Sequence, residues 1–135
     1  SDIVNCLLDT HAFLWSAFTP RKLSAKARDI VADPENDIVV SAVTFWEISL
    51  KHGLGKIELE GIAPDDLPRA AGRMGYELLS LDSEDAASFH RLPRVGHKDP
   101  FDRMLAHQAI RKRRALISCD VEMTAYAPYG LEILW

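Results

Sequence analysis

Cysteine, long apolar runs and excess positive charge are all scarce in this sequence, and each absence excludes a class of protein. Only two of the 135 residues are cysteines, which is too few for a disulfide scaffold. Cys6 and Cys119 both lie in apolar stretches, so we expect reduced core residues and a cytoplasmic protein. No stretch approaches the roughly 20 apolar residues of a membrane span.

The charge balance and the length narrow the possibilities further. Sixteen Lys and Arg against 20 Asp and Glu give a net charge of −4, which argues against a protein held to duplex DNA mainly by electrostatics. The chain is 47% hydrophobic and 27% charged, as in ordinary globular proteins. At about 100–200 residues per domain, we expect residues 1–135 to form a single domain.

Short apolar runs alternate with segments that carry helix-capping residues. The runs predict five strands, near residues 3–8, 38–40, 76–81, 116–119 and 131–135. Six helices are predicted between them, near 11–18, 24–32, 41–53, 65–74, 83–92 and 99–113, with Ser24, Ser83 and Asp99 as N-caps, and 56–59 as a short extended piece. Strands that are apolar throughout are buried on both faces. The fold class is therefore α/β, with a central parallel sheet of about five strands and helices on both faces.

Two acidic residues directly follow predicted strands. Asp9 comes after the first strand and Asp120 after the fourth, so both belong at the carboxyl edge of a parallel sheet. Ligands bind at that edge in folds of this kind. Each aspartate taken alone is more simply explained as a turn or helix-capping residue.

Two further acids lie on predicted helices. Glu47 shares a face with Val43, Trp46 and Leu50, which is costly for an acid without a partner, although an ion pair with Lys51 is the alternative. Asp102 lies in the first turn of the helix starting at Pro100, on the stripe of Leu105, Ala106 and Ala109; a charge that complements the helix dipole is its alternative role. Asp99 is most simply the N-cap.

Four carboxylates at one edge would repel one another, and a divalent cation removes that conflict. An all-oxygen site selects Mg²⁺ or Mn²⁺, and the sequence has neither paired cysteines nor the HExxH spacing of zinc sites. Such sites cleave phosphodiesters by activating water and stabilising charge on the phosphate. The candidate catalytic and metal-binding residues are Asp9, Glu47, Asp102 and Asp120.

Several segments, taken in order, resemble the PIN-domain nucleases, and most closely the VapC-type toxins of bacterial toxin–antitoxin pairs. They are residues 7–11, 40–51, 54–57, 97–106, 116–120 and 126–135. The resemblance implies a three-layer PIN fold and a Mg²⁺- or Mn²⁺-dependent endoribonuclease, commonly a homodimer, inhibited by a cognate antitoxin. Asp9, Glu47 and Asp102 match the family's three principal acids, and Asp120 matches a fourth, more variable one. Thr10, Ser118 and Asp99 are expected around them.

Basic residues close to Asp102 are the candidates for contacting RNA phosphates, namely Arg94, Lys98 and Arg103, with Arg91 and His97 beside them. A solvated loop is the alternative. The run 111–114 is expected to be solvated at the far end of its helix. Trp15, Trp46 and Trp135 either pack in the core or line an apolar groove for the antitoxin.

Three other functions have to be weighed. A PIN-fold protein can bind RNA or protein without cutting it. A receiver-like domain needs a second acid beside Asp9 and a lysine after a late strand, where this sequence has Thr10 and no lysine after Cys119. A phosphatase-like Mg²⁺ site needs an Asp-x-Asp pair, where this sequence has Asp9-Thr10-His11.

Overall fold

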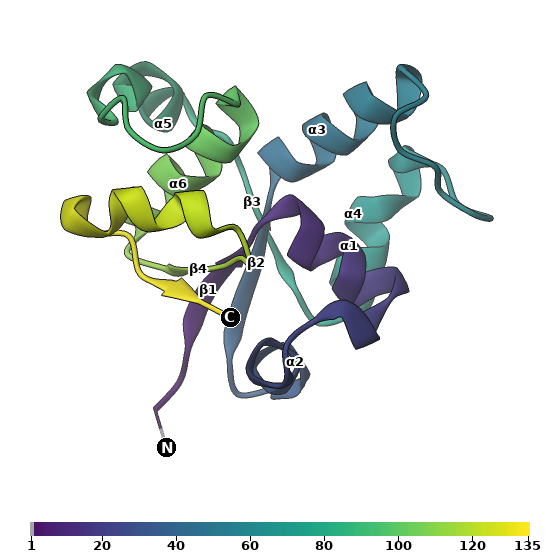
Figure 1. The fold of residues 1–135 in the computed structure, drawn as a ribbon. Helices are drawn as coiled ribbons and strands as arrows, with labels where there is room; N and C mark the ends of the chain where they lie inside the picture. Colours follow the sequence, from purple (N-terminus) through teal and green to yellow (C-terminus); the bar gives the residue numbers. More distant parts are fainter. Residues whose placement is uncertain (1) are drawn as a thin grey trace.

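A computed structural model describes residues 2–135, and its centre is a five-stranded sheet (Figure 1). The strands are β1 (Asn5–Leu8), β2 (Asp37–Ser41), β3 (Glu77–Leu79), β4 (Ala115–Ile117) and β5 (Ile133–Leu134). Their order across the sheet is β3-β2-β1-β4-β5, and every neighbouring pair is parallel. The predicted parallel sheet is confirmed. All strands therefore end at the same edge of the sheet.

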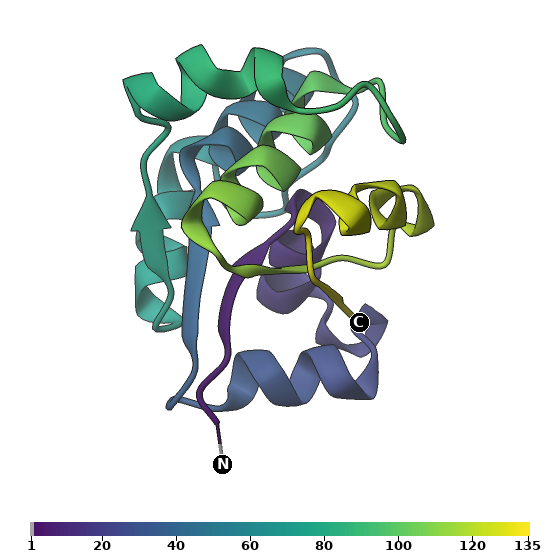
Figure 2. The same ribbon diagram turned by 90° about the vertical axis from the view of Figure 1, so that its left-hand side faces the viewer.

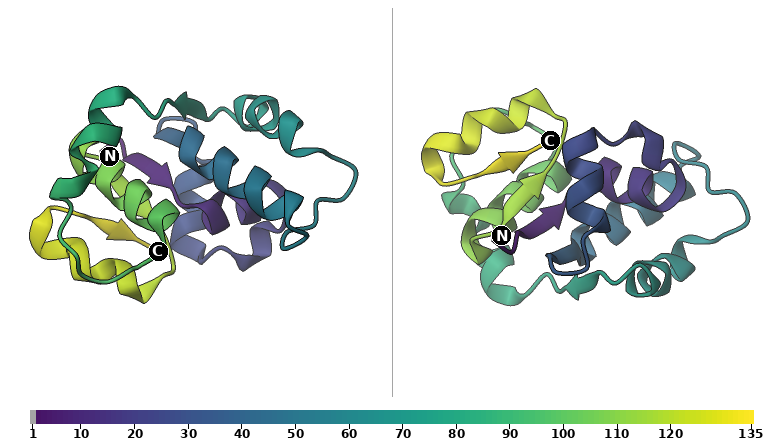
Figure 3. Two further views of the ribbon diagram at one scale, coloured as in Figure 1. Left: turned by 90° about the horizontal axis from the view of Figure 1, so that it is seen from above. Right: turned by 90° about the horizontal axis from the view of Figure 1, so that it is seen from below.

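Helices connect the strands. The α-helices are α1 (Thr10–Phe18), α2 (Ala25–Ala32), α3 (Ala42–Gly53), α4 (Leu67–Arg73), α5 (Ser83–Ser88) and α6 (Pro100–Lys112). Short 3₁₀ helices are η1 (Pro20–Lys22), η2 (Pro64–Asp66), η3 (Phe89–Arg91) and η4 (Val121–Tyr129). Helix α3 continues from the end of β2 beyond the sheet edge (Figure 1), and the segment that follows it projects from the rest of the chain (Figure 3).

The core has two layers, one on each face of the sheet, because successive side chains of a strand point to opposite faces. On one face Cys6 and Leu8 pack with Phe13 of α1 and with residues of α2 and α4. On the other face Leu7 packs with Leu105 of α6 and with residues of η4. Helices thus cover both faces, as the apolar strands predicted (Figure 2).

Some local predictions were wrong. Asp82, not Ser83, caps α5, accepting a hydrogen bond from the Asp85 N–H at 2.7 Å. Residues 56–59 form no strand, and the 3₁₀ helix η4 was not foreseen. Cys6 is buried as predicted, but Cys119 is exposed because β4 ends at Ile117 and the chain then leaves the sheet. No helix within residues 2–135 is both long enough and apolar enough to span a membrane.

The face of α3 also differs from the prediction. Its buried residues are Val43, Thr44, Glu47 and Ile48. Trp46 and Leu50 were placed on the same stripe as Glu47, but they are 58% and 45% exposed. The helix projects beyond the sheet and is covered where it faces α1, α6 and η2, whereas Trp46 and Leu50 stay largely in solvent.

Candidate metal centre

The candidate site lies where three helices begin at the carboxyl edge of the sheet. Asp9 is the N-cap of α1, Asp99 the N-cap of α6 and Asp120 the N-cap of η4. In each case the Oδ1 atom accepts a hydrogen bond from a backbone N–H of the helix that follows, at 2.7–2.9 Å. The capping role that the sequence left open is therefore confirmed for all three. Helix N-termini carry partial positive charge, which favours gathering acids here.

Asp9 is almost fully buried, with 6% of the residue exposed. Burial raises the pKa of its carboxyl group, and hydrogen bonds from the Ser118 hydroxyl and the Ala12 N–H partly offset that effect. The charge of Asp120 acts in the same direction as burial. Ser118, predicted beside the acids, is itself buried and contacts Asp9.

Glu47 enters the same region from α3 and is only 2% exposed. The Thr10 hydroxyl donates to its Oε1 at 2.6 Å, and Thr10 in turn lies 3.3 Å from the Thr44 hydroxyl. Lys51 forms an ion pair with Oε2, as the alternative reading of the sequence predicted. Burial lowers the pKa of Lys51, but the hydrogen bond and charge of Glu47 raise it by more. The charges of Asp99 and Asp102 raise the pKa of Lys51 as well.

Asp102, Asp120 and His97 form the tightest cluster at the edge. One ligand atom from each lies within 4.8 Å of the other two. The His97 Nε2 contacts Asp120 Oδ2, and its Nδ1 lies 3.6 Å from Asp102 Oδ2. Burial, followed by the charges of Asp99 and Glu47, raises the pKa of Asp102 to about 6. The charge of Asp9 adds a smaller contribution in the same direction.

The residues present fit a divalent cation. Burial, and after it the negative charges of Asp99 and Glu47, raise the pKa of Asp102. The side-chain cations Lys51 and His97 face these acids. The pKa of His97 is raised, because its hydrogen bond with Asp120 and the charges of Asp102, Asp120 and Glu122 outweigh the lowering effect of burial. Carboxylate oxygens are the ligands that Mg²⁺ and Mn²⁺ prefer.

The basic residues near Asp102 fall into two groups. Arg94 and Lys98 are exposed and line a pocket of about 400 Å³ together with His97 and Arg103. The Arg103 guanidinium donates to the carbonyl oxygens of Leu92 and Pro93 at 3.1 and 3.4 Å and stacks over Phe89. Arg103 therefore anchors the loop that carries Arg94 and Lys98.

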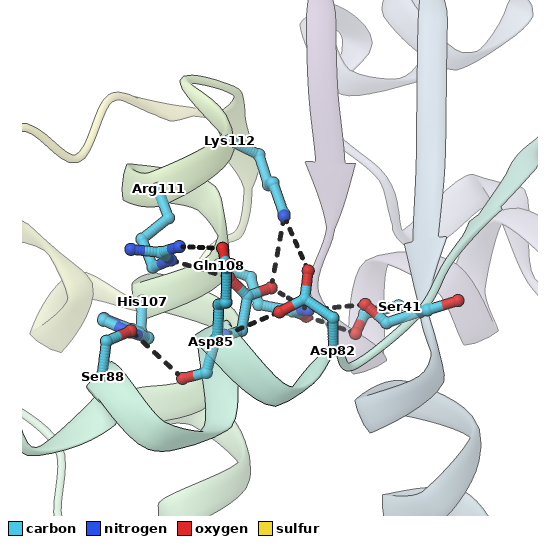
Figure 4. A network of polar contacts seen from close by, with 10 residues as sticks. Ser41, Asp82, Asp85, Ser88, His107, Gln108, Arg111 and Lys112 are labelled. Atoms are coloured by element: carbon cyan, nitrogen blue, oxygen red, sulfur yellow. Dashed lines mark hydrogen bonds and ion pairs between the residues drawn. The ribbon is translucent and has the colours of Figure 1, made fainter.

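The basic run at the end of α6 is exposed at Arg111 and Arg113, as expected, but Arg111, Lys112 and Arg114 also form ion pairs that were not predicted. Arg111 Nε lies 2.7 Å from Oδ1 of Asp85, which is fully buried, and Lys112 pairs with Asp82 at 3.1 Å (Figure 4). Arg114 pairs with Asp37 on β2. The sequence feature that could have predicted these ion pairs is the acidic first turn of α5, because its acids need basic partners where α5 packs against α6.

The same network joins the two helices that carry Asp102 and Glu47 (Figure 4). Gln108 on α6 donates to Asp85 at 3.0 Å and accepts from the Ser41 hydroxyl. Ser41 is the N-cap of α3. This buried contact fixes α3 against α6 and so fixes the position of Glu47 relative to Asp102.

The PIN domain family matches residues 6–127. The chain belongs to the PIN domain family. The fold of this PIN domain is similar to VapBC2 from Rickettsia felis bound to a DNA fragment from its promoter (TM-score 0.65, 12% identity, 97% and 98% of the two chains). It is also similar to DNA-bound VapBC from Salmonella typhimurium (TM-score 0.63, 17% identity, 98% of each chain covered). A third similar structure is VapBC-5 from Mycobacterium tuberculosis (TM-score 0.57, 19% identity, 97% of this chain and 98% of that chain covered). No curated protein matches the chain in sequence.

One residue of the site had a different predicted role. His97 was grouped with the basic residues as a candidate for RNA phosphates, but it lies among carboxylates and its side chain is 16% exposed. Its neighbours come from α6 and η4, and the 3₁₀ helix η4 could not be placed from the sequence.

Proposed function

We propose that this PIN domain is a cytoplasmic endoribonuclease dependent on Mg²⁺ or Mn²⁺, and that it acts as the toxin of a toxin–antitoxin pair. The observation that carries the proposal is the convergence of acids from four elements. Asp9 and Asp120 follow β1 and β4, and Glu47 and Asp102 come from α3 and α6. The elevated pKa of Asp102 supports a site that needs a cation when all four are charged.

In the proposed mechanism Asp9, Glu47, Asp102 and Asp120 hold the ion. When bound, a divalent ion supplies activation of water and stabilisation of charge on the phosphate. The chain's own groups orient these carboxylates: Ala12 N–H and Ser118 hold Asp9, and Thr10 holds Glu47. Attack by water on the phosphodiester leaves 5′-phosphate and 3′-hydroxyl ends, whereas attack by the 2′-hydroxyl leaves a cyclic phosphate.

An RNA cleavage assay tests the proposal. We expect the wild type to cut RNA in MgCl₂ or MnCl₂, and to lose the activity in excess EDTA. Asp9→Asn keeps the cap of α1, so it should fold normally and cleave no RNA. Asp29→Asn on the exposed side of α2 is the matched control and should retain full activity. Cleavage by Asp9→Asn, or in EDTA, would contradict the metal assignment; RNA binding without cleavage by the wild type would favour the silent PIN-fold alternative.

Arg94 and Lys98 are the residues we assign to RNA phosphates. Both are exposed, on the loop that precedes α6, and their pocket adjoins His97 and so the acids. Each phosphate contact releases counterions, so the logarithm of affinity falls with the logarithm of salt concentration. We expect Arg94→Ala to reduce that slope by about one. An unchanged slope would remove Arg94 from the interface.

The antitoxin is proposed to bind a groove beside α1. Trp15 and Phe18 line it with Ile57 and Leu59, and Glu58 and Glu60 add acidic groups. Trp15 also packs against Trp135, with ring centroids 5.8 Å apart, so it is held in place. An apolar floor with acids beside it suits an amphipathic segment with flanking basic residues. Unchanged affinity of Trp15→Ala for the antitoxin would eliminate this groove.

A homodimer is proposed to cover the outer side of α3. Trp46, Leu50 and Leu54 are 58%, 45% and 61% exposed, and they follow one another at helical spacing. Trp46 packs edge-on against Phe101 of α6, with the ring centroids 4.9 Å apart. This contact joins the exposed stripe to α6. Analytical ultracentrifugation should show a dimer for the wild type and a monomer for Leu50→Glu. A monomeric wild type would refute this assembly.

A further inference from the structure

The His97 side chain lies inside the acidic cluster. Its Nε2 contacts Oδ2 of Asp120, and its Nδ1 lies 3.6 Å from Asp102 Oδ2 and 3.4 Å from Glu122 Oε2. The side chain is 16% exposed and so offers little surface to a polyanion. An ion bound between Asp102 and Asp120 would therefore either coordinate the imidazole or displace it.

The loop that carries His97 is built to resist displacement. Gly96 adopts a φ of +65°, in the left-handed region that favours glycine. A Cβ atom at this position would lie 2.8 Å from the Glu122 carbonyl oxygen and 3.1 Å from the Ala125 Cβ. At position 96 the loop therefore approaches η4 more closely than any residue other than glycine would allow.

A second contact fixes the start of the same loop. The Arg103 guanidinium donates to the carbonyl oxygens of Leu92 and Pro93, which ties the loop to α6. Since α6 carries Asp102 and η4 begins at Asp120, the loop is fastened to both elements that supply the carboxylates. The imidazole is therefore held beside Asp102 and Asp120 from two sides.

We propose that His97 is a ligand of the divalent ion, and that it makes this centre a mixed nitrogen and oxygen site that favours Mn²⁺ over Mg²⁺. The inference rests on the proposed function, because it concerns the same ion. Mg²⁺ takes oxygen ligands and gives up its water reluctantly. First-row transition ions accept imidazole nitrogen, and Mn²⁺ combines that tolerance with a preference for carboxylates, which Mg²⁺ does not.

Pulsed electron paramagnetic resonance of the Mn²⁺-loaded protein tests the ligand directly. In imidazole-free buffer with substoichiometric MnCl₂, the wild type should show ¹⁴N modulation from a coordinated nitrogen. His97→Asn should lose the modulation, whereas His52→Asn, which replaces an exposed histidine on α3, should keep it. Because the first measurement uses the wild type, a failure of the variant to fold does not affect it.

Calorimetric titration measures the selectivity. For His97→Asn we expect the Mn²⁺ dissociation constant to rise about 10- to 100-fold, and the Mg²⁺ constant to change much less. Equal changes for the two ions, or Mn²⁺ bound to the wild type without ¹⁴N modulation, would overturn the role of His97 and leave the nuclease proposal standing. Absence of saturable binding of either ion to the wild type would refute both.

Discussion

Replacing Asp102 by asparagine should stabilise the metal-free protein. Raising the pKa of this carboxyl group from 3.8 to about 6 makes its charged form about 3 kcal/mol less favourable in the folded chain than in the unfolded chain. Asparagine removes that cost and also the contact with His97, so we expect a net gain of about 2 kcal/mol at neutral pH. With an unfolding entropy of about 2.1 cal/mol/K per residue, the gain corresponds to a Tm about 7 °C higher.

The pH dependence follows from the direction of the shift. Well below pH 3.8 Asp102 is protonated in both states, and the two proteins should differ little. Between about pH 4 and 6 the unfolded chain releases this proton while the folded chain still holds it, so the wild type loses stability as the pH rises. The advantage of the variant therefore grows over this range and is constant above it.

Thermal unfolding in EDTA from pH 4.5 to 8 measures both effects, with Asp29→Asn as the control for loss of an exposed carboxylate. Added MnCl₂ should reverse the order, because the wild type gains about 2.7 kcal/mol at 100 times its Kd while the variant gains little. Equal or lower stability of Asp102→Asn in EDTA at pH 7.5, or an advantage that does not shrink toward pH 4.5, would refute the reasoning.

Three further changes probe the surroundings of the site, each by urea unfolding. Gly96→Ala should cost about 2 kcal/mol, from a left-handed backbone and a Cβ 2.8 Å from a carbonyl oxygen; a neutral effect would mean that the loop is not fastened as described. Tyr126→Phe should be neutral or stabilising by up to about 1 kcal/mol, because the buried hydroxyl has no hydrogen-bond partner in the part of the chain that the structure describes; a clear loss would reveal one. Asp85→Ala should cost about 2–3 kcal/mol, since it leaves Arg111 and Gln108 without their shared acceptor, and an unchanged midpoint would show that the network contributes nothing.

The sheet could be predicted from the sequence because its strands are apolar on both faces. The run around Leu7 and the run around Val39 alternate with capped helices, and that combination indicates a parallel sheet. Parallel strands that end at one edge bring Asp9 and Asp120 to the same side. Their neighbourhood therefore followed from topology alone.

Side-chain partners could not be predicted in the same way, because they depend on how helices rotate and pack. The periodicity of α3 placed Trp46 beside Glu47, but the helix projects beyond the sheet and exposes Trp46. His97 was read as a basic loop residue, since nothing in its local sequence shows that the loop folds back onto η4. The sequence likewise gives no sign that Asp85, near the start of α5, is buried against Arg111.

In two of the four candidate acids one carboxylate oxygen caps a helix while the other faces the site. Asp9 and Asp120 each accept a hydrogen bond at Oδ1 from the first turn of the helix that follows. Truncating either of them to alanine would remove a fold determinant and a chemical group in one step, and the resulting inactivity would be uninterpretable. Asparagine keeps the oxygen that caps the helix and removes the negative charge, so it separates the capping role of the side chain from its role in the site.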